Sequence, residues 1–394
     1  MKVLVIACGW EQEPLLKSLF SIESIHVFAV HYDKEFLNFP FADVLITDLR
    51  NLDKILDFAK ENKVECVISD QDDFGHTAQA YVASNLNIPG PSFHSAQLSA
   101  NKYLQRMRCL EVGVKIPKFS LVASIEDLIS FVDVNGLPVI IKPIDNRGSI
   151  GVLKISSSNE LRNKFYQSIG QSYAALCIVE EFIVGREVTV DGYCLSSIPK
   201  SLGIASKEKL DEDLQVSFEI KYPASNITKD LRKKIFKINE DVASILNYDF
   251  GFIHSEYLID ADENVYLVES ANRGGGCFTS QLIMPEHTGV DVLSQYINDC
   301  LGQAVFARND KEGREVMLSF ISASMGKIKE LNGFDLLMND ADVLHCRWTK
   351  SIGDRIECVT DDSNRLGFLI VKAVDDVVAL TMKKKNLLTI TIEK

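Results

Sequence analysis

The chain has 394 residues, of which 46% are hydrophobic and 25% are charged, a balance typical of folded globular proteins and not of disordered or fibrous ones. At roughly 100 to 200 residues per domain, this length excludes a single small module and predicts several packed domains. The 55 Asp and Glu residues outnumber the 42 Lys and Arg residues, which gives a formal net charge of −13. Because such a chain has no net basic field to attract phosphate backbones, we expect no nucleic-acid partner.

The cysteines and the N-terminus both indicate a cytoplasmic protein. Nine cysteines are an odd number with no CxxC pair, which favours reduced thiols over a disulfide framework. The apolar run at residues 3–8 is too short for the core of a signal peptide and far too short to span a bilayer. We therefore expect a cytoplasmic location and no membrane partner.

Residues 1–94 alternate short apolar runs with helix-like segments. Strands are predicted at residues 3–7, 26–30, 44–47 and 64–69, and helices at 13–20, 52–61 and 77–85. This alternation predicts a doubly wound parallel sheet, whose ligands bind beyond the carboxyl ends of the strands, here at residues 8–10 and 69–73. At Gly9 a strand-ending turn is favoured over a phosphate contact. Since no GxGxxG pattern follows, an NAD-dependent dehydrogenase is excluded.

Turn signals divide the remainder of the chain. The segment IPGP at residues 88–91 marks a boundary, a helix is predicted at 95–112, and a second alternation of strands and helices continues to about residue 305. The tail from about residue 316 is rich in short strands. The fold class is therefore α/β, with predicted domains at residues 1–94, 95–305 and 306–394, the last of them small and β-rich.

A hairpin is the most informative stretch of the sequence. Apolar runs at residues 252–259 and 265–270 are joined by a polar loop. If Asp260 and Val265 close that loop, Glu256 lies opposite Glu269, with their Cβ atoms roughly 4.5 to 5.5 Å apart. Like charges at that distance are destabilising, and a divalent cation bound by both carboxylates would compensate for the repulsion.

Other residues around this hairpin carry chemistry of the same kind. His254 shares a strand face with Glu256, because side chains alternate along a strand. Arg273 and three glycines follow the second carboxylate, and backbone without side chains can approach an anion closely. The alternative interpretation, an exposed hairpin with scattered acids, does not account for these additions.

Two upstream segments suit a nucleotide. Lys142 ends the buried strand predicted at residues 136–143, and the flexible turn at 146–152 is rich in hydrogen-bond donors, as a polyphosphate requires. A surface lysine that ends a strand is the commoner interpretation of Lys142 alone. Further on, the extended segment at residues 178–183 can pair with an adenine edge, and Glu187 can accept a bond from a ribose hydroxyl.

Taken together, these motifs resemble the ATP-grasp superfamily, and more closely its carboxylate–amine ligases, such as L-amino acid ligases, with a biotin-carboxylase-like layout. The matching pieces lie in order over residues 95–305: Lys102 in the helix before GVKIP, the strand IIKP, the turn SIGV, the hinge EEFIVGRE, and the hairpin from HSE to ESANRGG. Residues 1–94 resemble the α/β domain that precedes the ATP-grasp domain. The tail resembles the β-rich closing domain of biotin carboxylase relatives.

The resemblance implies a role for each matching residue. Nucleotide binding is implied for Lys102, Lys142, Ser149, Gly151, Glu180, Phe182, Ile183 and Glu187. Glu256 and Glu269 would hold Mg²⁺, with Mn²⁺ as an alternative, while Arg273 and His254 would be catalytic. Residues 118–178 would form a mobile lid. Many members of the superfamily have Asn where this chain has Ala271, which puts a second metal ion in question.

The implied reaction activates a carboxylate with ATP as an acyl phosphate and joins it to an amine, with ADP and phosphate as the other products. Small-molecule acids and amines are then the partners, and the sequence leaves a monomer and a homodimer open. The acidic run at residues 69–73 suits an ammonium group better than a substrate phosphate. Lys207, Glu219, Asp72 and His287 are further candidate substrate contacts. The alternatives are a purine-pathway-type ligase or carboxylase, and a nucleotide-binding regulator without turnover.

Overall fold

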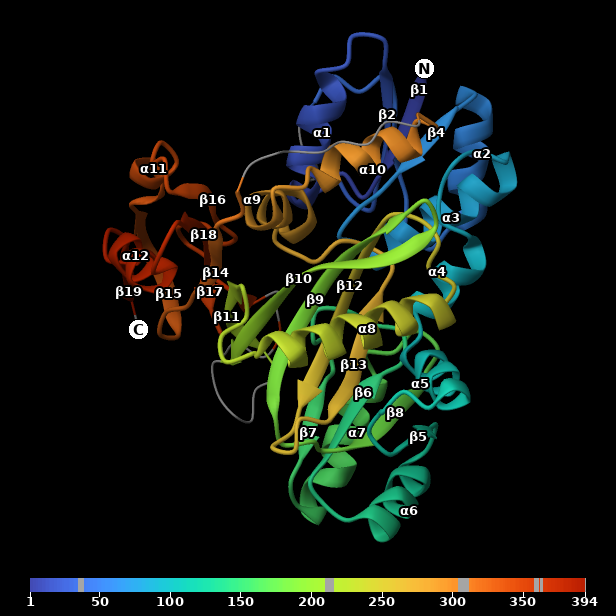
Figure 1. The fold of residues 1–394 in the computed structure, drawn as a ribbon, viewed down its shortest axis with the longest axis vertical. Helices are drawn as coiled ribbons and strands as arrows, with labels where there is room; N and C mark the ends of the chain where they lie inside the picture. The colour runs from blue at the N-terminus through green and yellow to red at the C-terminus, as the bar shows by residue number, and fades with distance from the viewer. Residues whose placement is uncertain (35–38, 210–215, 304–311, 358–360, 362–363, 394) are drawn as a thin grey trace.

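The computed structural model describes residues 1–34, 39–209, 216–303, 312–357, 361 and 364–393 (Figure 1). Within them the fold is of mixed α/β class, with one parallel sheet and three antiparallel sheets. The fold class expected from the sequence is therefore confirmed. The boundary predicted between residues 305 and 306 lies outside the described residues, as does Cys358.

The N-terminal sheet is parallel and has the strand order β3-β2-β1-β4. Its strands are β1 (Lys2–Ile6), β2 (His26–His31), β3 (Val44–Ile46) and β4 (Cys66–Ile68). Helix α1 (Glu13–Phe20) connects β1 to β2, α2 (Leu52–Asn62) connects β3 to β4, and α3 (Asp73–Leu86) follows β4. Residues 3–6 of the central strand β1 are apolar and fully buried, as expected where helices cover both faces of a sheet. The chain passes from one side of β1 to the other between β3 and β4. The topological switch point therefore lies at the carboxyl ends of β1 and β4, where such sheets bind ligands.

A helix from much later in the chain completes this N-terminal unit. In Figure 1, α10 (Val292–Cys300) lies over the N-terminal strands. The Tyr296 hydroxyl donates to the backbone oxygen of Ser69 at 2.6 Å and to Gln79 Oε1 at 3.0 Å. A short π-helical turn (Thr279–Ile283), α9 (Met284–Thr288) and α4 (Phe93–Ser99) lie between this unit and the large sheet.

The segment predicted as a lid contains a sheet of its own. Its strand order is β5-β8-β6-β7, formed by β5 (Phe119–Val122), β6 (Val139–Pro143), β7 (Leu153–Ile155) and β8 (Cys177–Glu181). Helices α6 (Ile125–Asn135) and α7 (Leu161–Ile169) cover one face, and their apolar side chains share a small core with Val139 and Ile141. Ser124 and Asp127 form a capping box that fixes the start of α6.

The large sheet has eight antiparallel strands in the order β13-β12-β9-β10-β11-β14-β18-β16. They are β9 (Arg186–Leu195), β10 (Ile198–Lys209), β11 (Ser217–Tyr222), β12 (Phe252–Ile259), β13 (Val265–Ala271), β14 (Glu315–Ile321), β16 (Val343–Trp348) and β18 (Gly367–Ala373). Helices α5 (Lys102–Val112) and α8 (Lys229–Ile245) pack on its first half. Because β11 pairs with β14, strands from before and after residue 305 belong to one continuous sheet.

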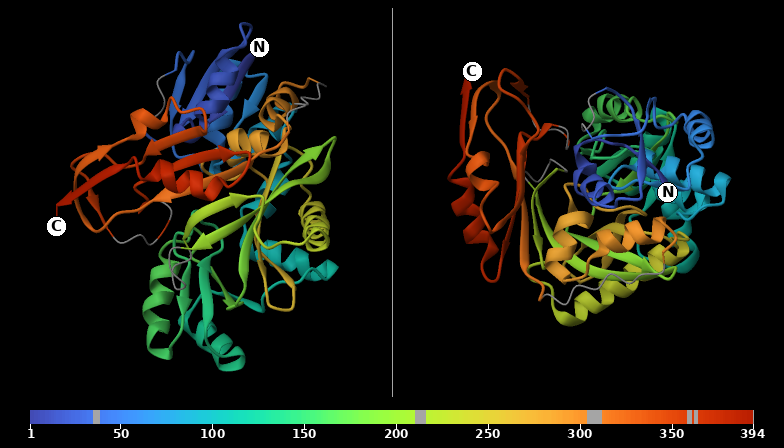
Figure 2. Two further views of the ribbon diagram at one scale, coloured as in Figure 1. Left: turned by 60° about the vertical axis from the view of Figure 1, so that its left-hand side comes forward. Right: turned by 90° about the horizontal axis from the view of Figure 1, so that it is seen from above.

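The remaining C-terminal elements pack against the second half of that sheet. They are β15 (Gly326–Asn332), β17 (Arg355–Ile356) and β19 (Thr389–Glu393), which form a three-stranded sheet, with α11 (Phe334–Leu337) and α12 (Val377–Lys385). Figure 2 shows this C-terminal part beside the N-terminal unit. Beside it, β18 of the large sheet contacts the N-terminal unit directly, since the rings of Trp10 and Phe368 have centroids 5.3 Å apart.

Two expectations from the sequence, reduced cysteines and the lack of a membrane-spanning segment, can be compared with the structure. The eight cysteines of the described part all have free thiols. Across the same residues, no helix combines the length and apolar composition that crossing a bilayer requires.

Candidate active site

A cavity of about 730 Å³ lies between the lid sheet and the large sheet. Nine of the residues that the sequence assigns to the site line it: Lys102, Lys142, Ser149, Glu180, Phe182, Ile183, Glu187, Glu256 and Glu269. Gly151, His254 and Arg273 do not line it. The fold thus gathers side chains from five strands, the helix α5 and the turn after β6 around one space.

Glu256 and Glu269 face each other across β12 and β13, as the sequence predicts. The expected closure of the loop is wrong by one residue, because Val265 pairs with Ile259 and not with Asp260. A β-bulge between Glu256 and Tyr257 then adds one residue to β13 and restores the predicted pairing. The bulge therefore brings both carboxylates to the same point of the cavity wall.

Two lysines neutralise this carboxylate pair. Lys207 Nζ lies 2.7 Å from Glu256 Oε1 and 2.6 Å from Glu187 Oε1, and Lys102 Nζ lies 3.1 Å from Glu269 Oε1. Burial opposes the ionisation of Glu256, but Lys207, His254 and Lys209 together outweigh burial and lower the Glu256 pKa to about 2. Glu256 is therefore ionised, as a metal ligand must be.

The donor set suits Mg²⁺ bound together with phosphates. Glu256 and Glu269 provide oxygen ligands from neighbouring strands, and Mg²⁺ sites commonly combine one or two carboxylates with substrate phosphates. Among the described residues, no group of three or more His, Cys, Asp or Glu side chains could hold a metal ion by itself. The geometry thus fits a metal that arrives with a nucleotide.

A second ion-pair group lies deeper in the cavity. Lys142 Nζ is 2.7 Å from Glu180 Oε2, and Arg106 Nε is 2.5 Å from Glu180 Oε1. Burial is the main cause that lowers the pKa of Lys142, whereas the pKa of Glu180 is lowered because Arg106 and Lys142 together outweigh its burial. Both carboxylate oxygens of Glu180 are occupied by cations. A contact between this carboxylate and adenine would require one cation to move.

Arg273 lies outside the cavity, where it joins the large sheet to the N-terminal unit. Its Nε and Nη2 atoms lie 2.8 and 2.9 Å from the two carboxylate oxygens of Asp73, at the start of α3. Burial opposes the ionisation of Asp73, but Arg273, with Arg147 and Lys102, outweighs burial and lowers the Asp73 pKa to about 2. Beside it, the Gly274 N–H donates to Asp70 Oδ1 at 2.8 Å, and the Ser280 hydroxyl donates to Asp70 Oδ2 at 2.6 Å.

From the sequence, the acidic run at residues 69–73 was expected to suit a substrate ammonium group. In the structure its carboxylates contact other parts of the protein instead. Asp72 forms an ion pair with Arg147, Asp73 pairs with Arg273, and Asp70 accepts bonds from the segment that follows β13. All three carboxylates hold parts of the protein together. The candidate contact at Asp72 is thus directed to an arginine of the lid.

His254 and Gly151, which do not line the cavity, are held by contacts within the protein. His254 Nδ1 lies 2.8 Å from Asp191 Oδ1, and its Nε2 is 3.9 Å from Glu256 Oε1, so its ring lies beside the carboxylate pair. Gly151 has φ +76°, and a Cβ there would lie 2.9 Å from Pro143 Cγ. A glycine at this position lets the turn after β6 close against the end of that strand.

Asn272 is not available as a metal ligand. Its side-chain amide donates to the backbone oxygens of Phe250 and Phe252 at 2.8 and 2.9 Å, and the residue is buried. Alternation along the strand puts Ala271, and not Asn272, on the face of Glu269. Among the described residues of β13 and Asn272, Glu269 thus remains as the candidate metal ligand.

The sequence analysis missed Arg106, the pairing of Asp73 with Arg273 and the ion pairs of Lys207. Arg106 lies one helical turn after Lys102, so a shared face with Lys102 was the signal that could have indicated it. Asp73 and Lys207 pair with residues far away in the chain, and no local pattern reports such pairs. Of the other candidate contacts, His287 bonds the backbone oxygen of Arg314, and Glu219 contacts Ser319.

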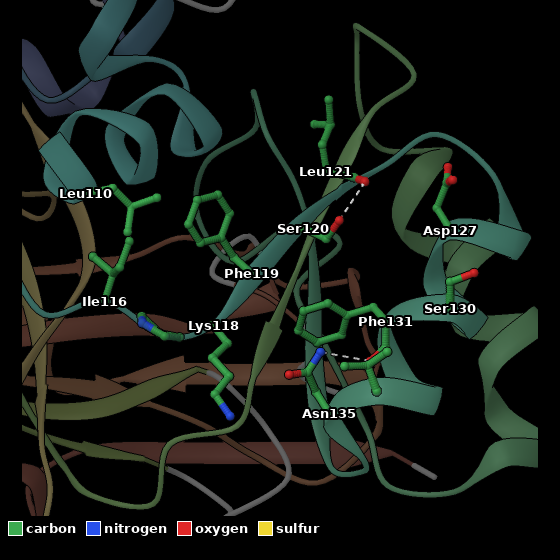
Figure 3. Close-up of a pocket in the computed structure, with 12 residues that line it drawn as sticks. Leu110, Ile116, Lys118, Phe119, Ser120, Leu121, Asp127, Ser130, Phe131 and Asn135 are labelled. Atoms are coloured by element: carbon green, nitrogen blue, oxygen red, sulfur yellow. Dashed lines mark hydrogen bonds between the residues drawn. The ribbon is translucent and has the colours of Figure 1, made fainter.

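A separate cavity of about 680 Å³ lies at the outer side of β5 and α6. Figure 3 shows that its walls are mainly apolar side chains and backbone, with Ser120 and Asn135 bonded to neighbouring backbone oxygens. Asp127 is engaged in the cap of α6. This cavity offers no paired carboxylates or clustered cations, so the site of chemistry is assigned to the first cavity.

Comparisons with known proteins agree with this geometry. The family model of the ATP-grasp domain matches residues 135–281, which include β6, the cavity strands and the carboxylate pair. D-alanine–D-alanine ligase from Azobacteroides pseudotrichonymphae genomovar. CFP2 is 26% identical over 283 residues, which cover 68% of this chain and 78% of that protein. Residues 135–281 are therefore an ATP-grasp domain. The resemblance noted from the sequence is therefore confirmed, and with it an ATP-dependent ligase of the carboxylate–amine class.

Solved structures show the extent of the shared ATP-grasp fold. L-Amino acid ligase from Bacillus licheniformis has a TM-score of 0.85 at 19% identity, with coverage of 100% of this chain and 99% of that chain. The biotin carboxylase domain of Hydrogenobacter thermophilus 2-oxoglutarate carboxylase, in complex with MgADP, has a TM-score of 0.76 at 16% identity and coverage of 100% and 91%. ATP-grasp proteins use ATP with Mg²⁺.

Proposed function

We propose that this ATP-grasp ligase activates the carboxylate of one amino acid as an acyl phosphate and joins it to the amine of a second substrate, giving ADP and phosphate. The observation that carries the proposal is the facing pair of Glu256 and Glu269 at the wall of a lysine-lined cavity. We place the enzyme in the cytoplasm, in keeping with its free thiols.

Each group of the cavity would supply part of the chemistry. Lys102 and Lys142 would contact the ATP phosphates, and the backbone of Phe182 and Ile183 would bind the adenine edge. Glu256 and Glu269 would hold Mg²⁺, which when bound neutralises charge on the phosphates. Arg273 would stabilise the transferred phosphoryl group and then the acyl phosphate, the positions where negative charge develops.

Exclusion of water is the second requirement, because water hydrolyses an acyl phosphate. The segment at residues 118–178 carries its own sheet and core, so it can move as a unit over the cavity. The ion pair between Arg147 and Asp72 would hold this lid against the N-terminal unit in the closed state.

Amino acids are the proposed substrates for two reasons. The relatives with similar sequence or fold include ligases whose names specify alanine and L-amino acids. In addition, the arginines that reach the end of β4, Arg147 and Arg273, are paired with Asp72 and Asp73, which leaves neither of them free for a substrate phosphate.

Product analysis tests the proposed function. Pairs of amino acids are supplied with ATP and Mg²⁺, and phosphate release is measured; hydroxylamine then replaces the amine. We expect ADP, phosphate and a hydroxamate. An acyl-adenylate mechanism would release AMP and pyrophosphate instead, and stoichiometric AMP, or no turnover with any pair, would contradict the proposal.

A further inference from the structure

A mixed cluster of charges lies at the switch point of the N-terminal sheet and adjoins the nucleotide cavity, whose wall includes Arg147. Glu11 follows β1, Asp72 follows β4, Arg147 comes from the turn after β6, and Arg347 lies on β16. We call these four residues and Trp10 the switch-point cluster. Three parts of the molecule that are remote in sequence thus contribute to it, at the place where doubly wound sheets bind ligands.

The members of the cluster lie close together. The Arg347 guanidinium lies 5.4 Å from the centroid of the Trp10 ring, and Trp10 is the neighbour of Glu11. Burial raises the pKa of Glu11 above its ordinary value, and Asp72 raises it further, whereas the positive charges of Arg147 and Arg347 lower it. A Cβ at Gly9 would lie 2.6 Å from Glu11 Oε2, so the glycine leaves room for this carboxylate to fold back over the turn.

Two opposite charges in the cluster have no ion-pair partner among the described residues, although Arg347 also lies over the Trp10 ring. Asp72 and Arg147 pair with each other, but neither Glu11 nor Arg347 forms an ion pair with any described residue. Arg347 Nε and the neighbouring Gln12 Oε1 are buried and have no hydrogen-bond partner among the described residues. Glu11 and Arg347 are half-buried. Because charges shielded from water are costly without a partner, an acid and an arginine without ion-pair partners in one place indicate a ligand with both charges.

The chemistry of the ligase supplies such a ligand, and this step rests on the proposed function. Joining two amino acids consumes one carboxylate and one amine, and leaves one ammonium and one carboxylate unchanged. We propose that Glu11 binds the ammonium of the amino acid that is activated, and that Arg347 binds the carboxylate of the amino acid that attacks. Neighbouring Asp72 and Asp73 connect the cluster to Arg273, beside which the acyl phosphate would form.

The assignment separates the two substrates, so it can be tested by kinetics. Glu11→Gln should raise the KM of the activated amino acid on the order of tenfold or more, because a charge-assisted bond is lost, and Arg347→Gln should do the same for the attacking amino acid. The KM of ATP should not change in either variant. The probes are the most active pair of L-amino acids, the des-amino analogue of the activated member, and the amide of the attacking member.

The analogues distinguish recognition of charge from general damage. The wild type should lose efficiency with each analogue, whereas Glu11→Gln should show no further loss with the des-amino analogue, and Arg347→Gln none with the amide. The matched control for Glu11 is Glu13→Gln, because Glu13 lies in the same segment and its carboxylate pairs with Lys17. The matched control for Arg347 is Arg355→Gln, on the three-stranded sheet. Both should behave as wild type.

Two outcomes would overturn the inference, and they differ from failure of the proposed function. If the wild type turns over but both variants keep wild-type KM values, the cluster does not bind the substrates. If a variant loses as much efficiency with both analogues as the wild type does, the substituted residue does not bind the ammonium or carboxylate that the analogue lacks. Absence of any turnover in the wild type would instead reject the ligase reaction itself, and this inference with it.

Discussion

Lys142 is almost fully buried, and its ammonium group is bonded to Glu180. Lys142→Ala should weaken ATP binding by about 1.5 to 3 kcal/mol, since a charge-assisted contact is lost while Arg106 still pairs with Glu180. Calorimetric titration of the folded variant with ATP measures the change, with Lys118→Ala, at an exposed lysine, as the control. Equal affinities for wild type and Lys142→Ala would remove Lys142 from the nucleotide site.

The carboxylate pair is expected to matter more for turnover than for nucleotide binding. Glu256→Gln and Glu269→Gln each remove one anionic oxygen ligand, so each should abolish phosphate release in the presence of Mg²⁺ while ATP affinity falls only modestly. Glu263→Gln, in the hairpin loop, is the matched control. A variant of the pair that retains full activity would show that its carboxylate is not a metal ligand.

Arg273 provides a test of shape as well as charge. Arg273→Lys keeps the positive charge but loses the planar fork that now binds Asp73 through two atoms. We expect a large fall in kcat with little change in the KM of ATP, because the role proposed for Arg273 is exercised in the transition state. A rise in the KM of ATP at unchanged kcat would indicate a ground-state contact instead.

At the scale of elements, the Asp73–Arg273 pair connects α3 with the segment that follows β13. The pKa of Asp73 is lowered from 3.8 to about 2, so the pair stabilises the fold above pH 3.8, and this contribution is lost as the pH falls towards 2. Asp73→Asn should therefore cost about 2 kcal/mol at pH 7 and flatten the acid dependence of stability in that interval. Urea unfolding at a series of pH values checks this, and parallel curves for both proteins would contradict it.

The elements also show how far the sequence could be interpreted. Alternation of residue types located β12 and most of β13, and with them the opposition of Glu256 and Glu269. The bulge before Tyr257 was not predictable, because it depends on how β13 packs and not on a local signal. In α3, the helix starts earlier than predicted because Asp72 caps it, accepting a bond from the Gly75 N–H at 2.7 Å.

The long-range ion pairs are the main feature of the site that the sequence did not predict. The lysines and glutamates of the cavity were found through short motifs, but their pairing in the structure was not, because Lys207 meets Glu256 only after β9, β10 and β12 assemble. The same holds for Arg106 and Glu180, and for the union of Glu11 with Arg347 in one cluster. Motifs report the identity of such residues, whereas their partners depend on the tertiary fold.

At the scale of the whole molecule, the eight-stranded sheet joins the central and C-terminal parts through β11 and β14. A chain that ends at residue 303 would leave β11 as an unpaired edge and remove Phe368 from Trp10 and Phe278. We expect this fragment to aggregate, since exposed edges and apolar patches promote association. Size-exclusion chromatography tests it. A monomeric fragment that binds ATP as the full chain does would support a separable domain after residue 305.

The lysines on the carboxylate pair have a consequence for the order in which ligands assemble. In the free protein, Lys102 and Lys207 act as internal counter-ions for Glu269 and Glu256. Arriving phosphates compete for these ammonium groups, and each lysine that turns to a phosphate releases a carboxylate for a metal ion. Nucleotide and Mg²⁺ should then favour each other's binding by the same factor, since such coupling is reciprocal. The enzyme would therefore bind Mg²⁺ appreciably only when ATP is bound as well.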